Sequence, residues 1–118
     1  MNDKLQYFGN KLMKEVRDRT IREFDLRVSG KMMDEESQRL ANKMQNMNEE
    51  QRELINKIIS QSIDLCIHNT LCLLEDNDDI VLLVDDISIS ECSDGLSGEL
   101  YTEDGWIQKF SEQRYDEI

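Results

Sequence analysis

Proline is absent from this chain of 118 residues. Proline breaks helices, because it has no amide hydrogen to donate and its ring clashes with the preceding turn. Its absence therefore permits long, uninterrupted helices. Long apolar runs are missing as well. None approaches the roughly 18 residues that a membrane-spanning helix requires, so we predict no association with a membrane.

Cysteine and histidine are scarce, with three cysteines and one histidine in the whole chain. The cysteines (Cys66, Cys72 and Cys92) are odd in number and form no CxxC motif, which argues against a disulfide-stabilised fold. We therefore expect a reducing environment, most simply the cytoplasm. The sequence also lacks a glycine-rich phosphate loop, an HExxH motif and a GxSxG motif, so it specifies no reaction. We expect no cofactor and no bound metal.

Basic residues are missing from most of the C-terminal half. Residues 1–60 contain twelve basic and eleven acidic residues, a net charge of +1, whereas residues 61–118 contain two basic and fifteen acidic residues, a net charge of −13. No Lys or Arg occurs between Lys57 and Lys109. This charge argues against binding to nucleic acid or to an anionic membrane, where phosphates attract the opposite sign. It permits docking to a basic protein, mimicry of a nucleic acid, or a role in solubility alone.

The leading hypothesis for function is a non-enzymatic binding or inhibitory protein whose acidic half occupies the basic surface of another protein. By charge and size alone, this is analogous to immunity proteins that neutralise toxins and to proteins that mimic nucleic acids. Carboxylates would steer the partner, and Tyr101 and Trp106 would anchor it, since aromatic residues dominate binding hot spots. The predicted binding residues are Asp76, Asp78, Asp79, Asp85, Asp86, Asp94, Glu99, Tyr101, Glu103, Asp104 and Trp106. The alternative for the aromatic C-terminal segment is that it packs against the helices.

The N-terminal half predicts two helices. Apolar residues recur near a period of 3.6 over residues 3–28, with Thr20 filling a gap, and Ser29-Gly30 ends this first long helix. Its opposite face pairs acids with bases four residues later, which indicates a self-neutralised solvent face; the pairs are Glu15 with Arg19, Asp18 with Arg22, and Glu23 with Arg27. A shorter, methionine-rich helix is predicted over residues 34–46.

The third predicted helix spans residues 49–74. Asn48 is a suitable N-cap and Gln51 completes a capping box. The later turns are apolar on most sides, so we expect the centre of the core there. After an acidic turn at residues 75–79, residues 80–84 predict a buried strand that pairs with residues 87–90 across Asp85-Asp86; the alternative for residues 80–90 is a fourth helix. Asp85-Asp86 is a poor hairpin turn, because it lacks glycine.

A last short helix is predicted over residues 103–114, with Thr102 as its N-cap. The whole chain is then a single, mainly α domain. Two long antiparallel helices are connected by a short helix, and a small C-terminal region holds strand and short helix.

One polar stripe crosses the otherwise apolar third helix. Asp64, His68 and Cys72 lie at spacings of four, so a carboxylate, an imidazole and a thiol occupy consecutive turns of one face. These groups serve in nucleophilic sites and also bind zinc. The favoured alternative is that the stripe, with Gln61 and Glu75, is only the polar face of the helix, with His68 satisfying Asp64. Three ligands on one helix spread along its axis, by roughly 6 Å for every four residues, and no second histidine is present.

Two other functions remain open at this point. The long helices have the length and patterning to pair between chains, which would make the protein a structural or homo-oligomeric one. The less favoured alternative is an enzyme or metal protein built on the polar stripe.

Overall fold

The computed structural model of the protein describes residues 3–117. A first helical rod consists of α1 (Asp3–Leu12), a π-helical segment η1 (Met13–Asp18) and α2 (Arg19–Arg27). After α3 (Glu35–Gln45), the second rod, α4 (Glu49–Asp76), returns beside the first. The remaining elements are β1 (Leu83–Val84), β2 (Ile87–Ser88), the 3₁₀ segments η2 (Ser90–Cys92) and η3 (Leu96–Leu100), and α5 (Trp106–Phe110).

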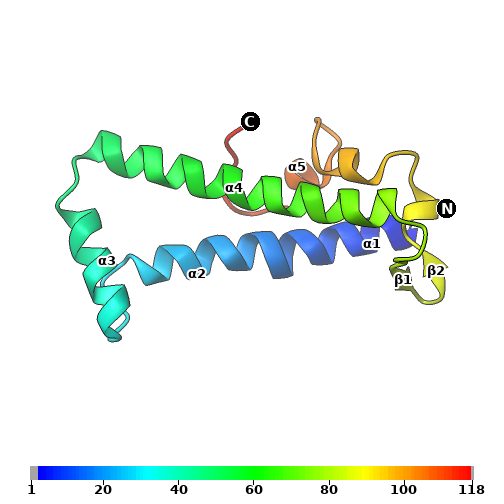
Figure 1. Cartoon of the computed structure of the whole chain (residues 1–118). Helices are drawn as coiled ribbons and strands as arrows, with labels where there is room; N and C mark the ends of the chain where they lie inside the picture. Colours follow the sequence, from blue (N-terminus) through cyan, green and yellow to red (C-terminus); the bar gives the residue numbers. More distant parts are fainter. Residues whose placement is uncertain (1–2, 118) are drawn as a thin grey trace.

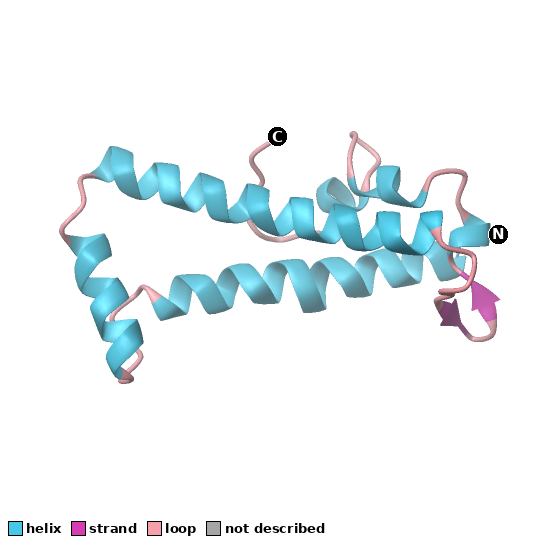
Figure 2. Ribbon diagram, in the orientation of Figure 1, coloured by secondary structure: helices cyan, strands magenta, loops and turns pink. Residues whose placement is uncertain are grey.

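The molecule is an elongated helical hairpin, with extents of 50 × 28 × 23 Å. The short helix α3 closes one end, and the β1–β2 hairpin lies at the other end (Figures 1 and 2). The segments η3 and α5 pack along α4 and α1, over the half of the hairpin that lies nearer the strands. The expected mainly α fold, with two long antiparallel helices and a short connecting helix, is confirmed. None of the helices in the described residues is long and apolar enough to cross a membrane.

The π-helical segment sets which face of the first rod is buried. In an α-helix of about 3.6 residues per turn, residues four apart drift around the axis. A π-helical turn holds more residues and so counteracts this drift. The buried row of the rod accordingly keeps a spacing of four, at Leu5, Gly9, Met13, Arg17 and Ile21. The next residue, Asp18, is also buried, beneath Ser111 and Glu112. Its predicted place on the solvent face, paired with Arg22, is therefore wrong.

The predicted helix boundaries hold where capping chemistry specifies them. Asn48 accepts a hydrogen bond from the backbone N–H of Gln51, and the Gln51 side chain accepts one from the N–H of Asn48, which is the expected capping box. Asp34 caps α3 through the N–H of Ser37. Gly30 ends the first rod with a φ of 88°, a conformation that glycine adopts without steric cost.

The core lies under the C-terminal segments. Its buried members are Leu5, Met13, Ile67, Leu71, Ile89, Leu96, Leu100, Trp106 and Ile107. Trp106 fills a notch in the first rod at Gly9, where an added Cβ would lie 2.3 Å from Cε2 of the indole. It also meets Phe8 edge to face, with ring centroids 5.8 Å apart. The far part of α4 contributes Ile67 and Leu71, as expected.

The C-terminal region differs from prediction in two places. Residues 80–90 form the strand pair rather than a helix, but only Leu83–Val84 and Ile87–Ser88 pair, in antiparallel register. The first strand is not buried as predicted, because Leu83 is exposed and Val84 is only half-buried. The last helix is shorter than the predicted 103–114 and begins after Gly105 instead of Thr102. Thr102 has a φ of 78° and therefore belongs to a tight turn, not to a helix start.

Candidate functional site

The end of α4 that faces the strands is acidic. Glu75 and Asp76 are its last residues, no base occupies its last turn, and Asp78 and Asp79 follow directly. The C-terminus of a helix carries partial negative charge, so bases stabilise this position by about 0.3–1 kcal/mol each and acids oppose it. The sequence therefore keeps four carboxylates where local stability favours the opposite charge.

The tip of the β-hairpin is acidic as well, at a further local cost. Asp85 and Asp86 form the two-residue turn with φ values of 50° and 66°. Such turns favour Asn-Gly, because a side chain at positive φ is strained. Lys4 donates to Asp85 at 2.5 Å, and this hydrogen bond and charge lower the pKa of Asp85 and raise the pKa of Lys4. Asp86 is exposed and has no ion pair among the described residues.

A groove of about 270 Å³ lies between these two acidic features. It is lined by Leu74, Glu75, Asn77, Asp78, Ile80, Val81, Ser88, Ser90 and Glu91. Its charged members, Glu75, Asp78 and Glu91, are all acids, and we call it the acidic groove. Ile80 and Val81 are 41% and 54% exposed, so apolar surface adjoins the carboxylates.

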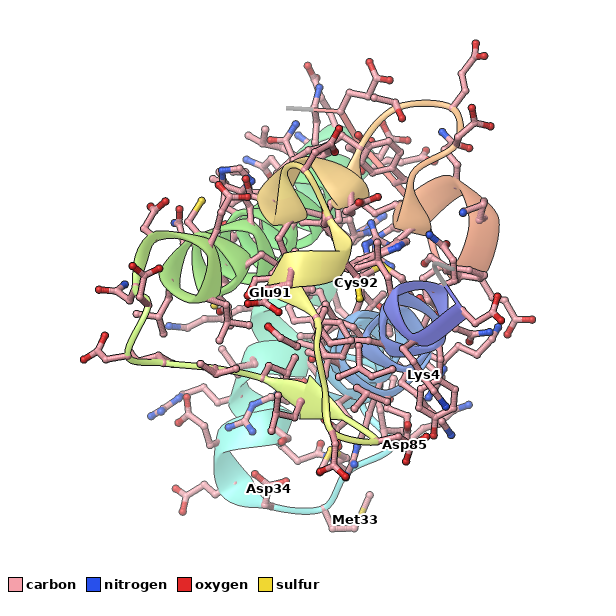
Figure 3. The ribbon with its side chains drawn as sticks, turned by 90° about the vertical axis from the view of Figure 1, so that its right-hand side faces the viewer. Lys4, Met33, Asp34, Asp85, Glu91 and Cys92 are labelled. Carbon is pink, nitrogen blue, oxygen red and sulfur yellow. The ribbon has the colours of Figure 1, made fainter. Side chains whose placement is uncertain are left out.

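Neighbouring segments position the walls of the acidic groove. The backbone N–H of Ser97 donates to Oε1 of Glu75 at 3.0 Å, which ties the end of α4 to η3. The backbone N–H of Ile89 donates to the carbonyl of Leu82 and extends the strand pairing by one bond. Figure 3 looks onto this end of the molecule, with Glu91 above the hairpin and Asp85 at its tip.

Most of the predicted binding acids are on the surface, but the structure does not gather them all. The exposed ones are Asp76, Asp78, Asp79, Asp85, Asp86, Asp94, Glu103 and Asp104. The segment that carries Glu103 and Asp104 lies on the other side of α4 from the β-hairpin (Figures 1 and 3). Glu99 is half-buried and accepts a hydrogen bond from the Ser93 hydroxyl at 2.6 Å.

The two predicted aromatic anchors are not free surface residues. Trp106 is 0% exposed in the core, so its assignment as a partner contact is wrong. The alternative, packing of the C-terminal segment on the helices, is what the structure has. Tyr101 is half-buried with its ring 5.7 Å from that of His68, and burial raises the pKa of its hydroxyl.

The predicted polar stripe of α4 is neither a solvent face nor a completed site. Asp64 is fully buried and receives two hydrogen bonds from Arg17, at 2.6 Å from Nε and 3.2 Å from Nη2. The expected pairing of Asp64 with His68 is therefore wrong, because the acid is used by the first rod. Burial raises the pKa of Asp64, and the Arg17 guanidinium opposes that rise.

The first residue of the stripe, Gln61, and its neighbour Ser60 contact the C-terminal segment. Gln61 donates to the carbonyl of Glu117 at 2.8 Å, and Ser60 next to it donates to Asp116 at 2.9 Å. Arg17 also donates to the Ser111 hydroxyl and to the carbonyl of Arg114, each at 2.8 Å. The polar face of α4 thus holds residues 111–117 against the helices. Sequence patterning assigned Arg17 to no role.

His68 and Cys72 do lie together. The imidazole Nε2 and the thiol Sγ are 3.5 Å apart, while Nδ1 of His68 is buried without a hydrogen-bond partner among residues 3–117. No carboxylate orients this pair, since Asp64 faces Arg17. Among the described residues, no group of three His, Cys, Asp or Glu side chains is placed to hold a metal ion.

Comparison of the chain with protein families, with characterised proteins and with solved structures finds no match.

Proposed function

We propose that the protein is a non-enzymatic binding protein whose acidic end docks a basic surface of another protein. The observation that carries the proposal is the acidic groove, in which three carboxylates adjoin the exposed Ile80 and Val81. A lysine or arginine fits such a groove, because its methylene stem covers apolar surface while its charged group reaches carboxylates.

Local energetics supports the same proposal. Acids at the C-terminus of α4 and two aspartates at positive φ both oppose stability. Proteins violate such local rules mainly at functional sites. Carboxylates that only maintained solubility would serve equally well at neighbouring exposed positions where they are free of strain.

Electrostatic steering is the expected mode of docking. Residues 61–118, which include the acidic end, have a net charge of −13. Such a charge attracts a basic partner over distances near the Debye length, about 10 Å at 0.1 M salt. We also propose that docking inhibits the partner, as it would for an immunity protein or a nucleic-acid mimic.

The first experiment uses the tagged protein as bait in a lysate of its host at low and at moderate salt. We expect a basic protein to be retained at low salt. Its affinity should fall at least about tenfold between roughly 50 and 200 mM salt. An affinity that is unchanged by salt would contradict steering by the acidic end.

A matched pair of variants then locates the contact. Asp78→Asn, Asp86→Asn and Glu91→Gln together remove three charges from the acidic end, and we expect this variant to lose most binding. Glu35→Gln, Glu50→Gln and Glu53→Gln remove three charges from exposed positions on α3 and α4 far from the strands. Equal losses in the two variants would show that only total charge matters.

A further inference from the structure

Three rows of side chains follow the first helical rod, each with a spacing of four residues. Beside the buried row runs a mostly apolar one: Phe8, Leu12, Val16, Thr20, Phe24 and Val28. A third row is fully exposed and alternates in sign: Lys11, Glu15, Arg19, Glu23 and Arg27. Each charged residue immediately precedes a member of the apolar row. The charged row therefore follows the edge of the apolar row along the rod.

The first three members of the apolar row form one wall of a groove of about 220 Å³, and α4 forms the other. We call it the apolar groove; its lining residues are Phe8, Leu12, Val16, Cys66, Ile67, Thr70, Leu71 and Leu74. None of them is charged, and Val16 is 43% exposed. Within the described part of the chain, no residue after Leu74 lines this groove. The C-terminal segments thus cover the polar face of α4 and leave the apolar groove open.

We propose that a second copy of this chain covers the apolar groove. The charged row gives the reason, because its signs run plus, minus, plus, minus, plus. About a two-fold axis between Glu15 and Arg19, an antiparallel copy places Glu15 opposite the partner copy's Arg19 and Lys11 opposite its Glu23. Both kinds of charged pair across the axis are then of opposite sign, and Arg27 lies opposite the uncharged Tyr7 of the partner copy, so no like charges meet.

The charges within one copy fit this arrangement. Lys11 and Glu15 are 3.6 Å apart and Arg19 and Glu23 are 3.5 Å apart, so the row is already ordered as a ladder of ion pairs. The charged row of the partner copy would place an opposite charge beside each of these ion pairs, so the contact would bury no unpaired charge. A strongly basic or strongly acidic partner would instead repel half of the row.

The acidic ends determine the direction of the two copies. Parallel copies would bring two acidic ends together, and like charges at such a contact are unfavourable. Antiparallel copies place each acidic end beside α2 and α3 of the other copy. Residues 19–57 contain eight basic and eight acidic residues, so this neighbour is neutral. The inference concerns a different surface from the acidic groove and does not rest on the proposed docking.

Sedimentation of the full chain over about 1–200 µM tests the proposal, since this range covers weak homodimers. Two variants make the charged row uniform in sign. Glu15→Arg with Glu23→Arg makes it basic, and Lys11→Glu with Arg19→Glu and Arg27→Glu makes it acidic. Each variant alone should dimerise at least about tenfold more weakly than the unmodified protein, and an equimolar mixture of the two should recover a mixed dimer.

The control is Glu103→Arg with Glu112→Arg, which adds the same charge as the basic variant at exposed positions of the C-terminal segments. Its dimerisation should stay within about threefold of the unmodified protein. A chain that remains monomeric over the whole range overturns the proposal. A dimer that neither the basic nor the acidic variant weakens also overturns it. So does an equimolar mixture of the two variants that forms no mixed dimer, provided that circular dichroism shows both variants to be folded.

Discussion

The helical hairpin has two halves that are built differently. The head, residues 3–18 and 60–117, contains all nine members of the buried hydrophobic cluster. The arm, residues 19–59, has only two buried hydrophobic residues among those described, Ile21 and Ala41. An open hollow of about 540 Å³ lies where α2, α3 and α4 diverge in the arm. The same pair of helices is therefore covered at one end and largely bare at the other.

Different interactions order the two halves. In the head, the C-terminal segments supply the core and hydrogen-bond to Arg17 and Asp18. Asp18 accepts from the Ser111 hydroxyl and from the backbone N–H of Glu112, the latter at 2.9 Å. In the arm, order comes mainly from the caps of α3 and α4, from local ion pairs and from the turn at Gly30. One long-range ion pair, Arg114 with Asp25 at 3.0 Å, ties α2 to the C-terminal segment. We infer that the head carries the global stability and that the arm opens at lower free energy.

We expect the largest loss of stability when the buried negative charge in the head, that of Asp64, is removed. Asp64→Asn leaves the buried Arg17 without its anionic partner, and an unpaired buried charge costs about 3–5 kcal/mol. Urea unfolding followed by the fluorescence of Trp106, the single tryptophan, measures the loss. A loss below about 1 kcal/mol, typical of a surface pair, would mean that the pair is solvated.

A double variant distinguishes the charge from the packing. Arg17→Met with Asp64→Leu replaces the pair by apolar groups of similar size, which is often neutral or stabilising in other proteins. We expect it to be more stable than Asp64→Asn. If both variants are equally unstable, the hydrogen bonds of Arg17 to Ser111 and to Arg114 are the more important contribution.

The next effect reverses a usual rule. Gly→Ala inside a helix ordinarily stabilises by about 0.5–1 kcal/mol. Gly9→Ala should instead destabilise by about 1–3 kcal/mol, because the new methyl overlaps the Trp106 ring. Gly98→Ala is the control, since no atom lies within 4 Å of its added Cβ. A stabilised Gly9→Ala would show that Trp106 is not seated in the notch.

Local rules predicted the helices well, because helix periodicity and caps depend on nearby residues. The capping box at Asn48 and the stop at Gly30 are both present. The last helix was wrong for a long-range reason. Trp106, the first residue of α5, packs against Gly9, about a hundred residues earlier, so a distant contact holds the first turn of this helix. The local signal was Gly105, where an added Cβ would lie 2.0 Å from the carbonyl oxygen of Tyr101, but no pattern within residues 101–114 gives the contact with Gly9.

The candidate site was predictable only in part. Charge counts identified the acidic half, and its loop acids are exposed as their composition suggested. The polar stripe of α4 was assigned to solvent, because sequence patterning cannot distinguish a solvated polar face from one that meets a polar partner. Arg17 is that partner, and it lies in the π-helical segment, within the buried row of the first rod. A lone arginine in line with a buried apolar row, Leu5, Gly9, Met13 and Ile21, was the available signal.

The arm should respond to its caps. Asn48→Ala or Asp34→Ala removes a cap worth about 1 kcal/mol. We expect faster hydrogen exchange of the amides in α3 and the start of α4, with the head unchanged. Uniform acceleration in both halves would contradict the separation of head and arm.

Acid provides a second measurement on the same cap. The hydrogen bond from Ser37 lowers the pKa of Asp34 in the folded protein. A carboxyl whose folded pKa is depressed contributes stability above its unfolded pKa and loses it as the pH falls through the folded value. Hydrogen exchange in α3 should therefore accelerate on acidification, beyond the intrinsic change, and should not do so in Asp34→Ala.

The smallest expected effect is a gain, and it separates stability from function at the acidic end. Asp86→Gly relieves a side chain at a φ of 66° and should raise the free energy of unfolding by about 0.5–1 kcal/mol. Asp79→Gly removes the same charge at a residue whose φ is not positive, so we expect no gain there. If Asp86→Gly is more stable but binds the basic partner more weakly than Asp79→Gly does, then the strained turn is kept for its carboxylate. Equal binding by the two variants would show that Asp86, although strained, does not contribute to docking. The contact would then centre on the α4 side of the acidic groove.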